Sequence, residues 1–508
     1  MACGFDPTIG YRYYMTIHMG VSRGPLDEIP IIKVADKTLW TGTLRDNGAV
    51  GIHKPDLFGG DSGEGGIDGS LTVMNGARSQ DVNGTLQNLI GKVVPAFRGV
   101  FTLLFDGMVC AMNPYPKAWS FRMRRVMRGW MDDECWYKEK AVIWLDKNGK
   151  TTSGAGFENG GNPDLNKIMA MNPAHIIFEC LTNREWGRGM PRALINELSF
   201  MACADKLADE GLGLCLRWTR QDSIQNFVQQ VLDMCGGTLY GDRSTGQLTM
   251  TLIRDDYDPD KLPLFDYTTG LLEINEFNTA TIPNGANEII VTYHDPISNQ
   301  DRQVRVQNLA MVQAAGRIIT QSVTYAGVPT AELATRLAQR DLRANAPGLK
   351  RLTLKLDRRG WKIPPAGVFK IADPYRGVGE MILRVGKIED GTVTDGAITI
   401  TAVQDVFGMP KTSFVVPQPP DWQPPDPLAK PAEFMAFEVP YADLRRNLQP
   451  QVFNNIDDSS CYLGVAALRP TENSINYHLA VKAGGETTYT ERGSGAFAPR
   501  ADMDGALA

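Results

Sequence analysis

The chain has 508 residues, of which 43% are hydrophobic, 22% charged and 8% aromatic, and its mean hydropathy is −0.22. This composition supplies enough apolar material for several cores, so it excludes a wholly disordered chain, and the length predicts about three domains. The net charge of −6 and the pI near 5.6 argue against a protein that wraps nucleic acid by charge alone.

The sequence shows no signature of membrane insertion. No stretch reaches the roughly 18 consecutive apolar residues that a transmembrane helix needs. The N-terminal segment is interrupted by Asp6, Arg12 and His18, so it lacks the continuous apolar region of a cleaved secretory signal.

The cysteines do not form a metal-binding or disulfide pattern. There are eight cysteines without CxxC spacing and only five histidines, so no clustered zinc ligands are present. Cys180, Cys203 and Cys235 lie among apolar residues in segments of helical pattern. We therefore expect buried free thiols there and a chain that folds in a reducing cytosol.

Residues 1–165 are predicted to be β-rich, because short apolar runs alternate with Gly, Asn, Asp and Pro. A glycine-rich loop, FGGDSGEGGIDGS, occupies 58–70. Its spacing fits neither GxGxxG nor GxxxxGK[ST], so we interpret it as a close backbone approach between strands or subunits rather than a phosphate cradle. The apolar runs are Ile29–Val34, Leu71–Met74, Val100–Phe105 and Ala141–Leu145.

The segment 117–130, KAWSFRMRRVMRGW, interleaves four arginines with aromatic residues, as nucleic-acid-binding surfaces do. A strand would place Phe121 and Met123 on one face and put alternate arginines on the other. In a net-acidic chain we favour arginines that pair with acids of a neighbouring element and so face protein. The four are Arg122, Arg124, Arg125 and Arg128.

Residues 166–260 are predicted to form a helical subdomain followed by a β-hairpin. Asn172-Pro173 predicts a helix start, and Pro191 is placed in the first turn of a second helix. A third helix should end at Gly236-Gly237, before a hairpin over 237–252. The second helix would carry the apolar stripe Leu194, Ile195, Leu198, Met201 and Ala202, and the third Ile224, Phe227, Val228, Val231 and Leu232.

No catalytic, cofactor or metal residue is predicted. The motifs HExxH and GxSxG are absent. His175 and Cys180 are five residues apart, an offset that does not align them on one helical face, so we interpret His175 as a packed core residue. An acidic run lacks the glycine and glutamate of an EF-hand and is interpreted as a solvated turn. Its carboxylates are Asp255, Asp256, Asp258 and Asp260.

Residues 261–410 are predicted to be a second β-rich region with one helix. Thr330 is expected to cap that helix. Its apolar face would be Leu333, Ala334, Leu337 and Ala338, and its opposite face Arg336, Arg340 and Arg343. An arginine row of this kind is compatible with a phosphate-binding stripe, but a solvated helix face or a subunit contact is more usual. The predicted strands are Glu288–Tyr293, Gln303–Val306, Arg317–Val323, Leu349–Leu356, Val368–Ile371, Met381–Ile388 and Ala397–Val403.

Residues 411–432 are predicted to be a proline-rich linker, since seven prolines fall within 417–431. Such density removes the backbone donors that a helix or central strand requires. Residues 433–508 are expected to begin a further β module. Because ADMDGALA at the end carries no closing element, we expect the sequence to be a portion of a longer chain.

Four stretches, in order along 57–410, together carry a family signature. They are LFGGDSGEGGIDG at 57–69; PAFRGVFTLLFDG at 95–107 with NPYPKAWSFRMRR at 113–125; NPAHIIFECLTNREWGRGMP at 172–191 with the following LINELSFMACADKLADEG; and GVFKIADPYRGVGEMILRVGKIE at 367–389. Together they resemble the tail-tip hub family of long-tailed phages, the N-terminal part of lambda-like tip attachment proteins.

The resemblance implies an α+β, predominantly β, multidomain fold, with small β-barrel hub domains, a helical middle subdomain and a C-terminal fibronectin-like β module. It implies a homotrimer in which two barrels per subunit present a pseudo-sixfold face to the tail tube, with an interface larger than ~2,000 Å². The protein would be a structural virion component at the phage tail tip, assembled in the host cytoplasm. It would join the tail tube to host-attachment fibre modules and form the channel for DNA ejection.

The implied partners are the distal tail and tail tube proteins, the tape measure protein, and other tail-tip and fibre proteins. Downstream modules would contact the host cell surface, and genomic DNA would pass without specific binding. No enzymatic activity and no cofactor are implied.

Two alternatives stay open. One is a spike or hub of a contractile injection or secretion system. The other is a tail-associated cell-wall hydrolase, which would need paired carboxylates or a metal set. The linker at 417–431 and the YPKAWSFRMRR stretch favour the phage hub.

Overall fold

The computed structural model is mostly β, with several sheets and a smaller number of helices, which confirms the fold class. The chain divides into two compact units, Met1–Pro417 and Gln418–Ala508. No helix in the described ranges is long and apolar enough to cross a membrane. The structure describes residues 11–60, 63–91, 93–111, 115–151, 164–218, 223–279, 286–344, 349–392, 394–405, 431–457, 459–470, 474–482, 484–485 and 488–498.

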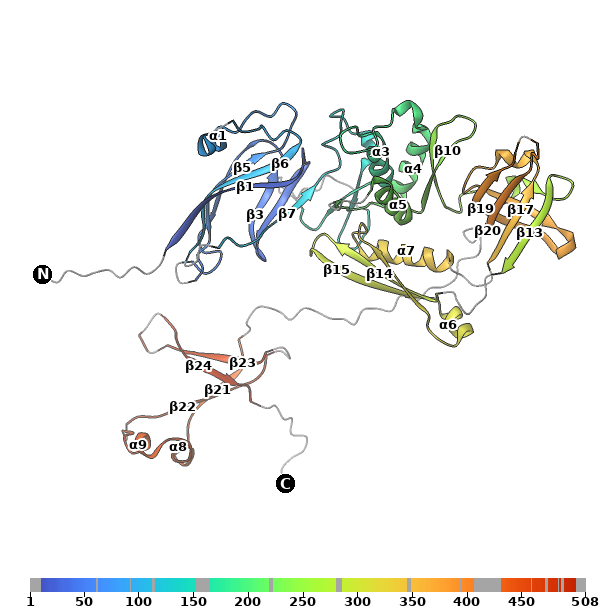
Figure 1. The fold of residues 1–508 in the computed structure, drawn as a ribbon. Coiled ribbons are helices and arrows are strands. Elements are labelled where there is room, and N and C mark those ends of the chain that lie inside the picture. The colour runs from blue at the N-terminus through green and yellow to red at the C-terminus, as the bar shows by residue number, and fades with distance from the viewer. Residues whose placement is uncertain are drawn as a thin grey trace, which may run out of the picture. The chain divides into compact units, whose positions relative to one another are not determined.

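The first β body, residues 12–124, consists of two antiparallel sheets around one core (Figure 1). Alternate residues of the strands point inward, so Phe101, Leu103 and Phe105 of one sheet meet Ile29 and Ile32 of the other, all fully buried. One sheet has the order β1 (Arg12–Arg23), β6 (Val100–Ala111), β5 (Ile67–Met74) and β4 (Gly48–Lys54), and the other β3 (Lys37–Leu44), β2 (Glu28–Val34) and β7 (Trp119–Arg124).

Two glycines lie opposite each other where the backbones of the paired strands β5 and β6 come close together. Gly69 and Gly107 are paired in the antiparallel register. A Cβ on Gly69 would lie 2.3 Å from the carbonyl oxygen of Asp106, and one on Gly107 would lie 2.3 Å from that of Asp68. The glycine-rich segment therefore permits a close backbone approach within the chain, as predicted. Positions 61 and 62 of that segment lie outside the described residues.

The helical part of the first unit contains the predicted helix caps and hairpin. Asn172 caps α3 (Pro173–Thr182) and Ser223 caps α5 (Ile224–Cys235). Helix α5 ends at Gly236, whose φ of 65° is the left-handed cap conformation. The hairpin is β10 (Gly237–Gly241) with β11 (Leu248–Leu252). A short helix, α2 (Lys138–Ala141), precedes the ribbon β8 (Val142–Leu145) and β9 (Ile168–Met171).

The predicted second helix is wrong in its start and its buried face. Residues 192–194 form a 3₁₀ turn, and helix α4 (Glu197–Asp209) begins after Asn196, whose side chain accepts a hydrogen bond from the Ser199 amide. Asn is a stronger N-cap than Pro191. Leu194 and Leu198 consequently lie 49% and 78% exposed. The buried face is Phe200, Cys203, Ala204 and Leu207.

A three-stranded sheet and helix α7 pack on the core of the helical part. The sheet has the order β15 (Gln300–Gln307), β14 (Glu288–Asp295) and β16 (Thr320–Tyr325). Helix α7 (Ala331–Ala344) buries the predicted face, and the Thr330 hydroxyl accepts from the Leu333 amide. The structure also contains α6 (Leu309–Ala315), a helix that the sequence pattern did not predict.

The second β body is a six-stranded sheet that encloses its own core (Figure 1). Buried residues from all six strands, such as Phe265, Ile274, Leu354 and Phe369, join one cluster, so the sheet curls around its apolar face. Its order is β12 (Leu264–Phe265), β18 (Val368–Asp373), β19 (Val378–Asp390), β20 (Ile398–Gln404), β17 (Lys350–Leu356) and β13 (Leu271–Thr279).

The described residues of the C-terminal unit form two two-stranded antiparallel sheets and two short helices. Among its described apolar residues only Ala467 is buried. Most of the predicted linker at 411–432 lies outside the described residues, which resume at 431. The elements are β21 (Phe434–Glu438) with β22 (Leu463–Ala467), β23 (Asn476–Val481) with β24 (Thr490–Ala496), α8 (Tyr441–Asn447) and α9 (Pro450–Phe453).

Candidate functional site

His175 is a packed core histidine, as predicted. Its ring is fully buried, and its Nε2 lies 2.9 Å from the carbonyl oxygen of Tyr137. The Trp136 ring lies 4.8 Å away, centre to centre. Burial lowers the pKa of His175 to about 4, although the hydrogen bond to the backbone opposes this shift. The neutral ring is part of an aromatic core with Trp130, Trp136 and Tyr137.

The three thiols that were predicted to be buried and free are buried and free in the structure. Cys180, Cys203 and Cys235 are buried and make no disulfide. Burial raises the pKa of each to about 12, so these thiols stay protonated at neutral pH. They are packing residues in this fold.

The acidic run at 255–260 is an exposed turn that holds no metal cluster. Asp256 lies 3.7 Å from Lys206, and Asp258 lies 3.0 Å from Lys261. The Asp258 carboxylate also accepts from the Asp260 amide and caps a 3₁₀ turn. Within the described ranges, no group of three or more His, Cys, Asp or Glu side chains is placed to hold a metal ion.

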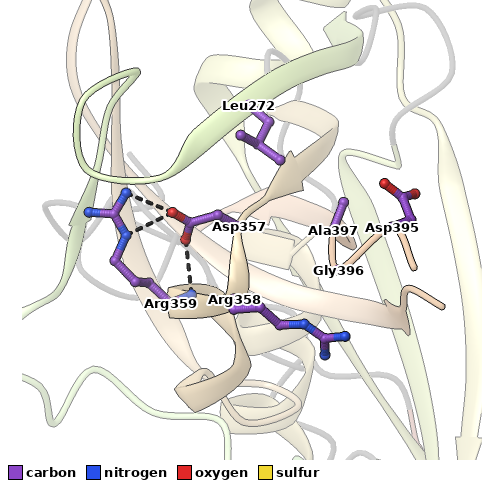
Figure 2. Close-up of a pocket in the computed structure, with 7 residues that line it drawn as sticks. All are labelled: Leu272, Asp357, Arg358, Arg359, Asp395, Gly396 and Ala397. Carbon is purple, nitrogen blue, oxygen red and sulfur yellow. Dashed lines mark hydrogen bonds and ion pairs between the residues drawn. The ribbon is translucent and has the colours of Figure 1, made fainter. Parts of the chain in front are cut away.

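An open depression of about 330 Å³ lies on the second β body (Figure 2). Leu272 lines one side, and the loop Asp395–Ala397 lines the other. The Asp357 carboxylate is already occupied by Arg359, whose Nε donates to it at 2.8 Å. No buried polar group converges on this surface, so it does not form a built ligand site.

The predicted arginine segment forms the junction between the first β body and the helical part. Strand β7 places Phe121 and Met123 against the core of the first β body, as the alternation predicted. Arg122 points the other way and donates to the carbonyl oxygens of Leu165 and Lys167 at 2.7 and 3.0 Å. Burial, aided by the charge of Arg124, lowers the pKa of Arg122 to about 10, so it stays charged at neutral pH.

Arg124 is the most buried of these arginines. It and its partner Glu28 are each 3% exposed, and its Nη1 donates to the Glu28 carboxylate at 2.5 Å. Its Nη2 donates to the carbonyl oxygens of Asp164 and Lys167 at 3.0 and 2.9 Å. Arg45 donates to the second oxygen of Glu28 at 3.1 Å. Glu28 is therefore shared between two arginines.

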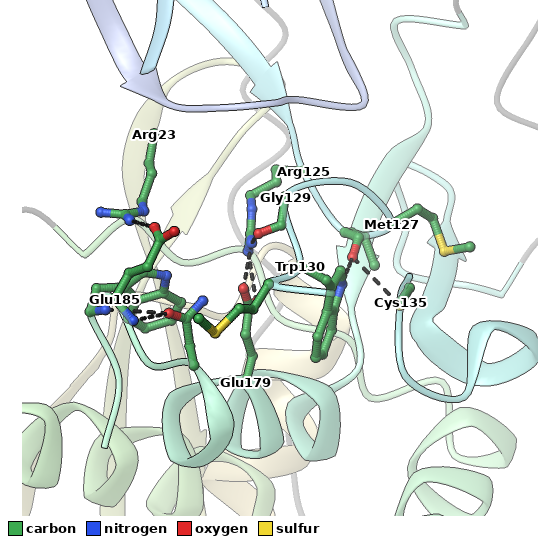
Figure 3. A network of polar contacts seen from close by, with 12 residues as sticks. Arg23, Arg125, Met127, Gly129, Trp130, Cys135, Glu179 and Glu185 are labelled. Atoms are coloured by element: carbon green, nitrogen blue, oxygen red, sulfur yellow. Dashed lines mark hydrogen bonds and ion pairs between the residues drawn. The ribbon is translucent and has the colours of Figure 1, made fainter. Parts of the chain in front are cut away.

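Arg125 extends the junction to helix α3 (Figure 3). Its guanidinium makes a two-pronged contact with Glu179, with one bond of 2.8 Å, and donates to the Gly129 carbonyl at 2.9 Å. Burial alone would lower the pKa of Arg125, but the hydrogen bonds and charge of Glu179 raise it. An exposed pair between Arg23 and Glu185 lies in the same network.

The prediction that these arginines face protein is confirmed within the chain. Arg128 completes the set, since its Nη1 donates to the Arg45 carbonyl at 2.9 Å and to Asp46 at 3.0 Å. Carboxylates take part at Arg124, Arg125 and Arg128, whereas Arg122 bonds only to carbonyl oxygens in the contacts above. These four side chains are consequently engaged in contacts within the chain.

Two of the α7 arginines make hydrogen bonds to neighbouring helices, so the predicted face is not purely solvated, and a subunit contact there stays a prediction. Arg340 donates to the carbonyl oxygens of Met234 and Asp233 at 3.0 and 2.9 Å, and Arg336 donates to that of Glu210 at 2.7 Å. These acceptors lie at the C-terminal ends of α5 and α4, where helices leave carbonyls without intrahelical donors. The side chains thus cap neighbouring helices.

Two arginines that sequence reasoning missed connect the helical part to the second β body. Arg254 binds Glu210 with two hydrogen bonds of 2.7 and 2.8 Å. Arg384 donates to Asp405 and to the Arg254 carbonyl, both at 2.8 Å. Arg243 adds a contact to Asp390 at 2.5 Å. The partners in these contacts are 21 to 147 residues apart, and no local pattern marks such pairs.

The comparisons with known proteins give one family match. Residues 223–388 match the model of a family described as "Putative phage tail protein". This region runs from α5 into β19 and covers less than half of the chain. The match shows that this region is similar to that family of phage tail proteins. A search of curated proteins finds no match.

Three solved structures show distant likenesses. The virion of a native gene transfer agent particle gives 14% identity over 82% of this chain and 81% of that chain, with a TM-score of 0.49. A tail protein from Neisseria meningitidis MC58 gives 10% identity, coverage of 75% and 98%, and a TM-score of 0.33. The 43 kDa tail protein of prophage MuSo2 from Shewanella oneidensis gives 11% identity, coverage of 75% and 99%, and a TM-score of 0.28.

Proposed function

We propose that this protein is a homotrimeric hub at the tip of a phage tail. It joins the tail tube to host-attachment modules and surrounds the channel through which DNA is ejected. The observation that carries the proposal is the family match over 223–388 to phage tail proteins. The two β bodies support it, because a ring built from trimers needs two similar contact units per subunit to meet a sixfold tube.

The arginine junctions support a mechanical rather than a catalytic role. The first β body is fastened to the helical part through Arg122, Arg124 and Arg125, and the second through Arg243 and Arg384. Guanidinium forks bind carbonyls and carboxylates with fixed geometry. Fastened in this way, the two bodies would keep their positions under the load of attachment and ejection.

The proposed channel passes DNA without gripping it. Each free Lys or Arg that neutralises a phosphate adds binding free energy through counterion release. The arginines of 122–128 are bonded within the chain, and the carboxylates at 255–260 are exposed. We propose an acidic or neutral inner face on this basis.

Cryo-electron microscopy of the particle, with an antibody against the chain as a label, tests the proposal. We expect threefold density for residues 11–405 at the tail tip, next to the tube. A chain missing from purified tails, or a location away from the tip, would refute the hub. A contractile sheath on the same particle would identify an injection system instead. A continuous basic stripe along the channel axis would refute the proposal that the channel passes DNA without gripping it.

A further inference from the structure

Helix α4 has an apolar stripe that the structure leaves uncovered. Leu194 and Leu198 were expected in the core, but they are 49% and 78% exposed, and the opposite face of the helix fills the core instead. Ala202, one turn after Leu198, is exposed as well, and Met201 beside it is half-buried. These residues recur at helical spacing, so they form one continuous surface rather than scattered exposed side chains.

Helix α6 (Leu309–Ala315) is apolar on all sides, yet little of it is buried. Six of its seven residues are apolar, and only Met311 is buried. Met311 joins none of the core clusters of the described residues. Leu309 and, shortly after the helix, Ile318 are 48% and 54% exposed. Figure 1 shows α6 at one end of the three-stranded sheet that it connects. A helix that is apolar all round is normally enclosed by protein, so α6 lacks a cover.

The two apolar surfaces carry opposite free charges. The segment 302–331, which contains α6, has no acidic residue, and Arg317 after the helix is exposed. Glu197, next to Leu198, lies in the first turn of α4. Neither Arg317 nor Glu197 has a side-chain hydrogen bond or an ion pair within the described ranges. Each is therefore available to a partner of the opposite charge.

The exposed stripe of α4 becomes acidic farther along the helix. Asp205 and Asp209 follow Leu198 and Ala202 at helical spacing, so they share that face. Their carboxylates lie 3.7 and 3.8 Å from the same ammonium group, that of Lys140, so two negative charges share one positive charge. A partner for this stripe should be apolar and free of acids, as the segment containing α6 is.

We propose that α6 of one copy packs on the exposed stripe of α4 in a second copy, with Arg317 of the first beside Glu197 of the second. Every copy carries both surfaces, both lack a cover in the single chain, and their charges attract. The contact removes apolar surface of both helices from water. The proposal rests on the homo-oligomer proposed above and specifies one of its contacts. Because the two surfaces differ, the contact is head-to-tail, and successive copies close into a ring.

Charge reversal in the full-length chain tests the contact by sedimentation velocity. Glu197→Arg alone or Arg317→Glu alone should weaken self-association about tenfold or more, because an attraction becomes a repulsion. The double variant should restore it, since the two charges are then exchanged. Glu139→Arg is the matched control, because Glu139 is an exposed acid in the first turn of another helix, α2, and should leave self-association unchanged.

The apolar part of the contact is tested separately. Leu198→Gln and Leu309→Gln should each weaken self-association about tenfold or more, because each removes apolar surface that the contact buries. Leu89→Gln is the control, since Leu89 is 57% exposed on helix α1 (Gly84–Ile90), outside both surfaces. If the chain assembles only within the particle, its incorporation into purified tails replaces sedimentation as the readout, with the same pattern expected.

The outcomes separate this contact from the proposed trimer. Restoration in the double variant supports the contact and shows that the single variants were folded, as circular dichroism spectra should also show. A wild-type trimer that the single reversals do not weaken, or that the double variant does not restore, overturns the contact and leaves the trimer in place. If Leu198→Gln leaves the trimer intact but prevents its incorporation into tails, another tail protein covers α4, and the contact between copies is overturned. A wild-type chain that is monomeric both free and in the particle overturns both proposals.

Discussion

Replacing Arg124 by Met should loosen the junction between the first β body and the helical part. The substitution keeps an unbranched side chain but leaves the buried carboxylate of Glu28 without its main partner. Both groups are 3% exposed, so water does not compensate the loss. Removing one partner of such a buried pair typically costs about 3–5 kcal/mol.

The cost should fall at the lower end of that range. Arg45 still donates to Glu28 at 3.1 Å, but its side chain is 40% exposed, so solvent partly screens that contact. We therefore expect about 3 kcal/mol, which corresponds to about a hundredfold faster local opening. The full chain has several cores and does not unfold in one step, so a local measurement is required.

Native-state hydrogen exchange read by mass spectrometry supplies that measurement, on peptides from β2 and β7. Arg128→Met is the control: its ion pair with Asp46 is exposed, and its loss should cost less than about 1 kcal/mol. Arg124→Met combined with Glu28→Leu should recover most of the protection, because an apolar pair replaces the buried charges. Equal exchange in the Arg124 and Arg128 variants would refute this reasoning.

Three further predictions concern the buried His175, the close approach of β5 and β6 at Gly107, and the cysteine thiols. The pKa of His175 is about 4 in the folded state and 6.5 in the unfolded chain. The stability that the neutral ring contributes is therefore complete above pH 6.5 and falls by at most about 3 kcal/mol as the pH drops toward 4. His175→Leu should flatten the pH dependence of thermal stability over this interval, and an unchanged slope would contradict the assignment. Gly107→Ala should destabilise the first β body by about 1–3 kcal/mol through backbone overlap, whereas Gly51→Ala, with open space around its Cβ position, should be nearly neutral in the same hydrogen-exchange assay; equal effects would rule out the close approach. Among the described cysteines, Cys461 is exposed and should react first with iodoacetamide at pH 8, while Cys180 should stay unlabelled in peptide maps of the folded chain; early labelling of Cys180 would show that its packing is wrong.

Helix ends that depend on neighbouring residues could be predicted from this sequence. The cap at Asn172 and the stop at Gly236 act through the backbone groups next to them, so the ends of α3 and α5 were predictable. The start of α4 was not, because Pro191 and Asn196 both suit a helix start and the choice depends on which side chains are buried. Phe200 is buried and Leu198 is exposed because the core lies on the side of α4 that carries Phe200.

The partners of the junction arginines, which are distant in the chain, could not be predicted from the sequence. The alternation in β7 indicated that its arginines face away from the core, but not that Arg122 binds carbonyls and Arg125 binds Glu179. Many acids have the right charge, and the fold selects one by bringing α3 beside the chain that follows β7. The same limit explains why Arg254 and Arg384 were missed.

The choice of acceptor at the junctions determines how the protein responds to salt. Ions screen the exposed pair of Arg23 and Glu185, so that contact should fade as ionic strength rises. The guanidinium of Arg122 instead donates to uncharged carbonyls in a buried place, where dissolved ions do not reach. The first β body should therefore keep its attachment to the helical part both in dilute medium and at high salt concentration.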